Sequence, residues 1–418
     1  MALSLHRYIG FGRNGDLNSI LKQRIKKERE RSPVIAIKIG DVLPENVIVE
    51  ILSWLPVKAL LQFKSVCKSW YAIISGRDFI SKHLTNYYNH KNDHNDCLLV
   101  HYYVSHGECQ LYELLIDDPP RVIGAETFYE MPMYGSNICG PCNGIYYLYH
   151  FGSYHDESHA LWNPAISELK VLPPIMTKPN LSSNRTFAEN EVYGFGYDTV
   201  TQDYKVVVLK GYCHEENEAS APWGVLIYSL MKDSWRYWGD LTQYYDLEQS
   251  ECYIVVNGCF YWLQRLSSAL IISFNVVTDA IQEIQVPVYD SGDDVDSYYK
   301  NNLAVYDDSL AFLVIHEHEK RLDIWTWNGG LWTKKFAIGT TIGIRRPIGH
   351  WKKNKLILES PEYGIFLCDP NTQEIWDLAF QMGCWCYGVF VYRESLVSIE
   401  DRNKWGHHEE AETDANHF

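Results

Sequence analysis

The sequence predicts an α+β protein, with a small helical unit near the N-terminus followed by a larger all-β body built as a propeller of about six blades. Two observations predict this division. Residues 41–82 hold two Leu-Pro pairs and an apolar stripe at three- and four-residue spacing, whereas a hairpin-like phrase recurs through the rest of the chain. The aromatic content, with 30 Tyr and 14 Trp in 418 residues, favours strands over helices in the body.

The helical unit contains two predicted helix starts, at Pro44 and Pro56. Proline suits the start of a helix because its missing N–H has no partner there and its fixed φ matches the helix. An apolar stripe follows the first proline, and a second continues from Leu60 to Ile74 with a bend expected near Phe63. A unit of roughly forty residues cannot bury all of this surface by itself. We therefore expect one apolar face to need a partner.

The helical unit contains, in order, a Leu-Pro pair, an Ile- and Leu-rich turn, a second Leu-Pro pair and Val-Cys-Lys-Ser-Trp at residues 66–70. This pattern resembles the F-box. The resemblance implies that the unit binds the Skp-type adaptor of an SCF (Skp–cullin–F-box) ubiquitin ligase, and through it the cullin and RING subunits. The candidate adaptor contacts that it implies are Leu43, Pro44, Ile48, Ile51, Leu52, Leu55, Pro56, Leu60 and Val66. The alternative is that these positions only form the core of a small helical domain, which applies more to Val66, Cys67 and Trp70 than to the Leu-Pro pairs.

The body is a repeat of strand, polar turn and strand. Five copies occupy residues 161–173, 226–238, 272–287, 322–336 and 365–378, and their turns start at Asn163, Ser229, Asn275, Thr326 and Asp369. Successive turn starts lie 66, 46, 51 and 43 residues apart, which is the period of kelch-like propeller blades, although the double glycine of a kelch blade is missing. A weaker copy at residues 111–115 would make six blades.

Two local predictions complete the propeller. Asn257-Gly258 predicts a tight hairpin turn, because a type I′ turn requires positive φ at both central residues. Residues 389–392 and 396–399 are expected to close the ring as strands against residues 98–100.

Short phrases in the body resemble the F-box-associated domain of plant proteins. They lie at residues 140–144, 161–165, 193–198, 203–207 and 332–335. Residues 351–354, residues 391–399 and a C-terminal Phe are similar to the S-locus F-box group of pollen. That resemblance implies recognition of non-self S-RNases and their ubiquitination in self-incompatibility. A related receptor with another target, in defence or hormone signalling, stays open as an alternative.

Charge and composition divide the chain further. We expect a basic, disordered extension at 1–40, the F-box at 41–82, a linker at 83–97, the propeller at 98–400 and an acidic tail at 401–418. The extension carries a net charge of +6 and the chain after residue 82 a net charge of −23. Such an acidic body repels nucleic acid and favours basic protein partners, unless its acidic loops only keep it soluble. The basic run at 22–31 fits a nuclear-localisation patch or, more simply, a solvated helix or tail.

The sequence offers little catalytic or metal-binding chemistry. Cys139 and Cys142 have the spacing of half a zinc site but no second pair follows, so a structural turn is favoured. His316 and His318 could share a metal on one strand face but fit a solvated hairpin end better. Gly194-Phe-Gly196 lacks the third glycine of a dinucleotide fingerprint. Cys67 lies in an apolar helix stripe, which predicts a buried core residue rather than a reactive thiol.

We therefore expect a non-enzymatic substrate receptor with no cofactor, no metal and no nucleic-acid partner. No run of eighteen apolar residues predicts a membrane span and no secretory h-region is evident, which favours the cytoplasm, with the nucleus as an alternative. Acidic loops at residues 214–218 and 290–296 are candidate target contacts. Two alternatives of another class stay open, a propeller enzyme with a helical prefix and a scaffold that binds the adaptor without ligase function.

Overall fold

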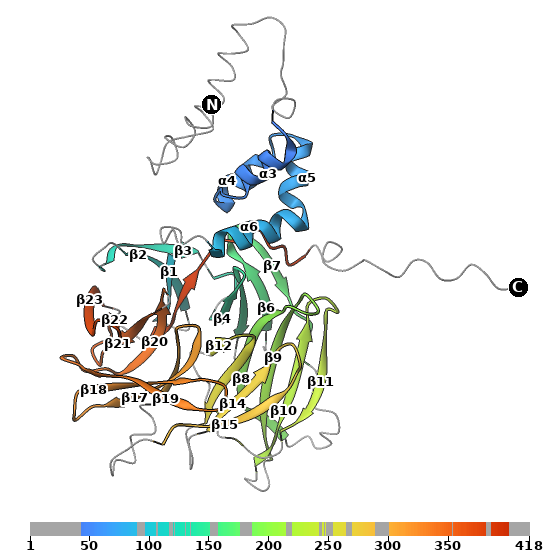
Figure 1. Cartoon of the computed structure of the whole chain (residues 1–418). Coiled ribbons are helices and arrows are strands. Elements are labelled where there is room, and N and C mark those ends of the chain that lie inside the picture. Colours follow the sequence, from blue (N-terminus) through green and yellow to red (C-terminus); the bar gives the residue numbers. More distant parts are fainter. Residues whose placement is uncertain are drawn as a thin grey trace, which may run out of the picture. The chain divides into compact units, whose positions relative to one another are not determined.

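The structure is a computed structural model that divides into two units, residues 1–55 and residues 56–418. It describes residues 43–89, 97–105, 108–116, 120, 122–129, 131–133, 135–150, 158–175, 186–214, 220–241, 245, 247, 254–264, 270–288, 301–352, 354–381 and 386–400. Each unit is described by itself below, with the element labels of Figure 1.

The described part of the first unit is the helix α3 (Glu45–Leu52) with its flanking residues. Pro44 stands at its N-cap, and its carbonyl accepts the first helical hydrogen bonds from the backbone N–H of Val47 and Ile48 at 3.0 and 3.2 Å. The first Leu-Pro pair therefore starts a helix, as predicted from the fixed φ of proline. Ile48 and Leu52 are buried.

The second unit begins with three short helices, α4 (Val57–Phe63), α5 (Lys68–Ser75) and α6 (Arg77–Asn89). The carbonyl of Pro56 accepts from the N–H groups of Ala59 and Leu60, so the second predicted helix start is also confirmed. The expected bend near Phe63 is a full break, because α4 ends there and residues 64–67 form a turn before α5. The Ser65 hydroxyl donates to the Gln62 carbonyl at 2.7 Å within this turn.

The rest of the second unit is six four-stranded antiparallel sheets, the blades of a propeller (Figure 1). Blade 1 holds β24 (Cys386–Tyr392), β1 (Cys97–Ser105), β2 (Glu108–Ile116) and β3 (Val122–Tyr129). Blade 2 holds β4 (Asn137–Cys142), β5 (Ile145–His150), β6 (Ser158–Asn163) and β7 (Glu168–Val171), with the 3₁₀ turn η2 (Pro164–Ile166) between the last two. Blade 3 holds β8 (Thr186–Asp198), β9 (Asp203–His214), β10 (Ser220–Ser229) and β11 (Ser234–Asp240).

Blades 4 to 6 follow in sequence order. Blade 4 holds β12 (Ile254–Val256), β13 (Cys259–Gln264), β14 (Leu270–Asn275) and β15 (Ile281–Gln285). Blade 5 holds β16 (Asn302–Tyr306), β17 (Ser309–His316), β18 (Arg321–Trp327) and β19 (Trp332–Gly339). Blade 6 holds β20 (Arg346–Trp351), β21 (Lys355–Glu359), β22 (Gly364–Asp369) and β23 (Glu374–Gln381). The prediction of a helical F-box-like unit followed by a propeller of six blades is confirmed.

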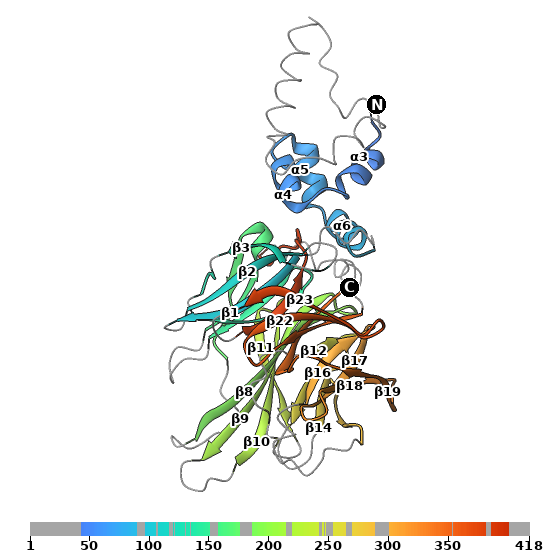
Figure 2. The ribbon, with the colours of Figure 1, turned by 90° about the vertical axis from the view of Figure 1, so that its left-hand side faces the viewer.

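Neighbouring blades meet through their first strands. β4 contacts β24 and β8, and β16 contacts β12 and β20. The ring closes where β20 contacts β24, the last strand in the described residues, which itself belongs to blade 1. Figure 2 shows the long strands β8, β9 and β10 of blade 3 side by side.

Ring closure is partly as predicted. Strand β24 pairs antiparallel with β1, with Leu98 opposite Val391 and Val100 opposite Val389. The second expected strand, at residues 396–399, is wrong, because residues 393–399 carry no strand. We name residues 393–399 the closing strap. Its backbone bonds to side chains of blade 2 instead of to a neighbouring strand, as described below for the candidate site.

The repeated phrase corresponds to the third and fourth strands of blades 2 to 6. Its polar turn residue has the same task in several blades, which is to accept a hydrogen bond from a backbone N–H two residues on. Asn163 accepts from Ala165 at 3.1 Å, Asn275 from Val277 at 2.9 Å and Asp369 from Asn371 at 3.0 Å. The predicted hairpin turn at Asn257-Gly258 is confirmed, with φ of 51° and 72°.

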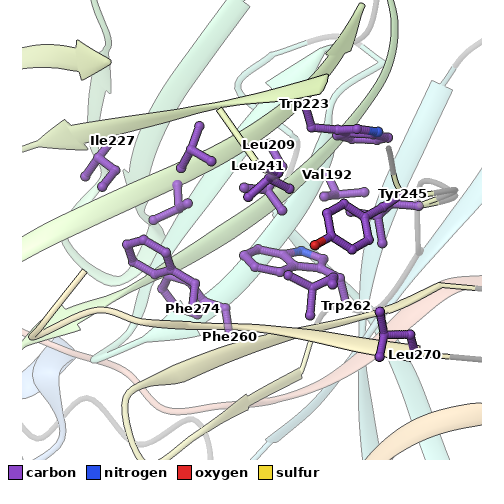
Figure 3. Packing of buried hydrophobic residues seen from close by; sticks show 14 of the residues in the cluster. Val192, Leu209, Trp223, Ile227, Leu241, Tyr245, Phe260, Trp262, Leu270 and Phe274 are labelled. Carbon is purple, nitrogen blue, oxygen red and sulfur yellow. The ribbon is translucent and has the colours of Figure 1, made fainter. Parts of the chain in front are cut away.

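The apolar core lies between the blades, and one of its clusters joins blade 3 to blade 4 (Figure 3). Trp223, Trp262, Phe260 and Phe274 are all buried in it, and the Trp262 indole donates to the Tyr193 carbonyl at 3.1 Å. The ring of Phe260 lies directly against β8. A Cβ added at Gly194 would approach that ring to 2.5 Å.

Gly194 and Gly196 therefore serve close packing between blades. A Cβ at Gly196 would also come within 2.9 Å of the Phe260 ring. The Gly-Phe-Gly phrase of the sequence is explained by this approach and not by a nucleotide loop, because it lies inside the strand β8.

A buried ion pair ties the same two blades together. The Lys205 ammonium lies 2.8 Å from the Asp198 carboxylate and 2.8 Å from the Val276 carbonyl of blade 4. Burial raises the pKa of Asp198, but hydrogen bonds from Lys205, Thr201 and Val200 outweigh it and lower the pKa to about 2. The phrase Tyr-Asp followed by Asp-Tyr-Lys at residues 197–205 thus serves inter-blade packing.

Gly194→Ala is expected to lower the free energy of unfolding by about 1–3 kcal/mol, because the new methyl group overpacks the Phe260 ring. Gly339→Ala is the matched control, since a Cβ there meets nothing within 4 Å. Urea unfolding of both variants measures the difference. Equal stability of the two variants would contradict the packing role of Gly194.

Asp198→Asn is expected to lower the free energy of unfolding at pH 7 by about 2 kcal/mol, the equivalent of the pKa shift. Because the folded pKa is below the unfolded value of 3.8, this contribution is present above pH 3.8 and is lost as the pH falls through about 2. The difference between wild type and variant should therefore narrow from pH 7 to pH 3 in urea unfolding. The exposed Asp377→Asn serves as the control, and an equal loss there would contradict the assignment.

Candidate functional site

Helix α3 presents apolar side chains on two faces. Ile48 and Leu52 are buried, whereas Leu43, Val47, Ile51 and Trp54 are exposed. The exposed residues follow one another at four- and three-residue spacing, which places them along one side of the helix. We name these four residues the α3 stripe. Large apolar side chains grouped on a surface in this way are typical of an interaction site.

The nine residues predicted from the sequence fall into two groups. Five of them are exposed, namely Leu43, Pro44, Ile51, Pro56 and Val66. Leu55 is half-buried, and Ile48, Leu52 and Leu60 are buried. The prediction omitted Val47 and Trp54, which complete the stripe. Their spacing from Leu43 and Ile51 is the signal that could have found them.

The turn between α4 and α5 corrects one prediction. Cys67 was expected in the core but is exposed, because α4 ends at Phe63 and the chain leaves the helical stripe there. The Cys67 sulfur instead accepts from the Trp70 backbone N–H at 3.5 Å and caps α5. Trp70 is half-buried and packs edge-on against Phe63, with ring centroids 5.3 Å apart.

The start of α4 is capped from the far end of the chain. The Glu394 side chain in the closing strap accepts hydrogen bonds from the backbone N–H groups of Val57 and Lys58. Burial raises the pKa of Glu394 and these hydrogen bonds oppose the rise. Helix α4 also contacts η2 of blade 2. Nothing local to residues 56–58 signals this cap, because its partner lies more than 300 residues away in the sequence.

The strap itself is held by blade 2. The Asn163 side-chain amide donates to the carbonyls of Ser395 and Val397 at 3.1 and 2.8 Å. The Glu168 carboxylate accepts from the Ile399 backbone N–H at 2.6 Å and from the Ser398 hydroxyl at 3.0 Å. A cavity of about 240 Å³ lies beside these contacts and is lined by Leu61, Lys64, Tyr71, Ser75, Arg77, Ile80, Ile166, Glu168, Leu396 and Ser398.

The cysteines and histidines that the sequence offered as possible metal ligands in the propeller have structural roles or lie apart from one another. Cys139 is buried in β4, and burial raises the pKa of Cys142 to about 12, which disfavours the thiolate that a metal site needs. His316 pairs with Asp323 at 3.0 Å, while His318 lies in the exposed turn after β17. In the described residues no group of three or more His, Cys, Asp and Glu side chains could hold a metal ion.

Several predicted segments lie outside the described residues. They are the extension at 1–40 with its basic run, the tail at 401–418, and almost all of the two candidate target loops at 214–218 and 290–296. Of the two loops only His214, the last residue of β9, is described.

The comparisons with known proteins agree with this architecture. A model of the F-box domain matches residues 41–82, and a model of the F-box associated beta propeller domain matches residues 126–398. The chain belongs to the F-box proteins with this propeller. It is 27% identical over 384 residues to F-box protein CPR1 of Arabidopsis thaliana, covering 85% of this chain and 88% of that protein. F-box/WD-40 repeat-containing protein 1 of the same plant is 26% identical over 314 residues, covering 71% and 69%.

Membership of this family has direct consequences. An F-box implies binding to a Skp-type adaptor, so the chain is an F-box protein of the kind that serves as a substrate adaptor of SCF ligases. Proteins of this family are typically non-catalytic. Among the helices of the described ranges, none has the length and apolar character to cross a membrane.

Leu52→Ala is expected to lower the free energy of unfolding of the helical region by about 2–4 kcal/mol, because it leaves a cavity at a buried site. Leu52 is 2% exposed and Ile51 is 44% exposed, so Ile51→Ala is the matched control and should change stability by less than about 0.5 kcal/mol. Urea unfolding followed by circular dichroism measures both. Equal effects would contradict the division of α3 into a buried and an exposed face.

Proposed function

We propose that this chain is the target receptor of an SCF ubiquitin ligase, with the α3 stripe as the main contact for the Skp-type adaptor and the propeller as the holder of a protein target. The observation that carries the proposal is the exposed α3 stripe within the region matched by the F-box. An exposed apolar row on a helix is the form in which helices dock into apolar grooves of partner proteins.

The adaptor contact is divided between direct and supporting residues. Leu43, Ile51 and the two prolines are exposed and can contact the adaptor, and so can Val66 in the second unit. Ile48, Leu52 and Leu60 are buried, so we assign them to supporting the helices that present the contacts. Burying apolar surface contributes roughly 25 cal/mol per Å² to the free energy of binding. A row of large apolar side chains can therefore form the centre of an interface.

The receptor acts through proximity. It holds the target near the ubiquitin-charged E2 enzyme, and the bond chemistry belongs to other subunits. This role requires no catalytic group, no cofactor and no metal in the chain itself. We place the target contacts on loops at one end of the propeller, with the acidic loops at 214–218 and 290–296 as candidates and a basic protein as the favoured target.

The S-locus assignment and an S-RNase target are finer proposals. Their support is the set of phrases at residues 351–354 and 391–399 together with the acidic body. A receptor for another target, in defence or hormone signalling, is the alternative within the same class. Expression confined to pollen would favour the S-locus assignment, whereas expression in leaves would count against it. We place the protein in the cytoplasm, with the nucleus as an alternative.

A non-ligase scaffold is the alternative from another class. Such a protein would bind the adaptor through the same stripe but would recruit no cullin and shorten no target's lifetime. A propeller enzyme would need converging carboxylates, histidines or tyrosines at the propeller axis. The half-buried His316–Asp323 pair and the buried Asp198–Lys205 pair are instead part of the blade structure.

The double change Val47→Asp with Ile51→Asp is expected to weaken adaptor binding by about 100-fold or more, because it places charges where apolar burial is needed. Val200→Asp with Leu331→Asp is the matched control, since both residues are exposed apolar side chains at propeller turns. The measurement is a titration of the full-length variants against the purified adaptor, followed by recovery of the cullin.

Retained binding in the α3 double variant would contradict the proposed contact. Loss of binding in both double variants would show a general effect of the added charge. Adaptor binding without cullin recovery would favour the scaffold.

A further inference from the structure

The closing strap touches three neighbouring blades along one end of the propeller. It leaves β24 of blade 1, bonds to Asn163 and Glu168 of blade 2, and reaches a small hollow in blade 3 that Ser398 and Ile399 line together with Leu230 and Met231. Ser395, Leu396, Val397 and Ile399 are almost fully buried. The strap is therefore a fixed part of the propeller and not a loose C-terminal extension of β24.

The strap also presses against the first turn of blade 2. Gly144 has a φ of +78°, and a Cβ placed there would lie 2.5 Å from the Ser395 Cβ and 2.9 Å from the Arg393 carbonyl. These contacts fix the strap on both sides of Glu394. The backbone of Glu394 is accordingly held in place by residues that have no part in the helices.

The Glu394 side chain points from this fixed backbone to α4. Its hydrogen bonds reach the N–H groups of Val57 and Lys58, which are the first two residues of the helix. The first N–H groups of a helix have no partner inside it, and the N-cap here is Pro56, whose side chain cannot accept a hydrogen bond. Glu394, a residue of the propeller, thus supplies the hydrogen-bond acceptor that the N-cap residue of α4 lacks.

A second contact keeps α4 in the same place. Residues of α4 lie against η2, the turn that begins directly after Asn163. Asn163 therefore both anchors the strap and starts the turn on which α4 packs. The contact at η2 lies on blade 2 and the hydrogen bonds at Glu394 come from the strap that follows blade 1, so both link the same helix to the propeller.

We propose that Glu394 is a positioning residue, which fixes α4, the first F-box helix of the second unit, to the propeller blades of that same unit. The functional part of this inference rests on the proposed function, because a ligase receptor must hold its target at a defined place relative to the charged E2. Its structural part, the cap on α4, does not depend on ligase activity.

Hydrogen exchange of the full-length chain tests the cap directly. Glu394→Ala is expected to accelerate exchange of the Val57 and Lys58 amides by about tenfold or more, because they lose their acceptor. Glu394→Gln should restore near-wild-type exchange, since its side-chain oxygen still accepts. Glu394→Asp should not restore it, because its carboxylate is one methylene shorter. Glu374→Gln, an exposed carboxyl in blade 6, is the control for a general effect.

The positioning role has a separate readout. In a ligase assembled with adaptor, cullin, RING subunit and charged E2, the lysines of the chain that become self-ubiquitinated report where the propeller lies. Glu394→Ala should leave adaptor affinity within about twofold, because the α3 stripe is untouched, but should spread modification over more lysines. Glu394→Gln should restore the wild-type pattern.

The outcomes separate the two claims. Wild-type exchange in Glu394→Ala would overturn the cap itself. Faster exchange with an unchanged lysine pattern would overturn the positioning role and leave a local helix cap. If no variant binds the adaptor, wild type included, the proposed ligase function fails, whereas the exchange experiment still decides the cap.

Discussion

The pairing of β24 with β1 is the constraint on which the rest of the second unit depends. A propeller blade is a twisted sheet with an apolar face on each side, and each face can be buried only by a neighbouring blade. A row of blades would leave two such faces in water, and the pairing of Cys97–Tyr102 with residues 386–392 removes both. The contact joins residues nearly 300 positions apart, so it forms at a high cost in loop entropy.

The closing strap extends this closure to a third blade and to the helices. Asn163 and Glu168 of blade 2 form hydrogen bonds with the strap backbone. Blade 2 thus holds the segment that directly follows β24 of blade 1. Because the same segment carries Glu394 to α4, the link from blade 1 to blade 2 and the cap of α4 share one stretch of seven residues. A change that detached the strap from blade 2 would therefore also disturb the Glu394 cap of α4.

The helix starts and hairpin turns could be predicted from the sequence, because they depend on residues that are close together in the chain. The helix starts follow from proline at residues 44 and 56, and four of the five hairpins follow from Asn, Asp or Ser at the turn, because these residues bond to nearby backbone. The fifth predicted turn start, Thr326, is wrong, because Thr326 is buried inside strand β18. The strap could not be predicted this way. Its mostly apolar residues 396–399 predicted a strand, but the partners of its backbone are side chains of a distant turn. Cys67 was misplaced for a related reason, since the helical period was continued through a break that the Ser65 turn imposes.

The candidate site shows the same division. Apolar spacing placed Ile48, Ile51 and Leu52 on α3, but periodicity alone does not say which of two apolar faces is buried. The buried residues Ile48 and Leu52 each follow an exposed apolar residue by one position along α3. Which of the two sets is buried depends on tertiary packing, and the local spacing does not contain that information. Val47 and Trp54 were missed because the family pattern rather than the spacing selected the contacts. The spacing, applied by itself, would have included them.

The charge distribution bears on the partner. In the described propeller, several buried acidic groups have basic partners within their own blades. Asp198 pairs with Lys205, Glu191 with Lys210 and Glu359 with Arg346. Such pairs contribute no net charge, so the −23 carried after residue 82 must come from acidic groups outside them, near solvent or in segments beyond the described ranges. Surface charge of one sign attracts partners of the other sign over about 8–10 Å in physiological salt. The net charge of the chain after residue 82 therefore supports the proposal of a basic target, independently of any resemblance to a particular receptor.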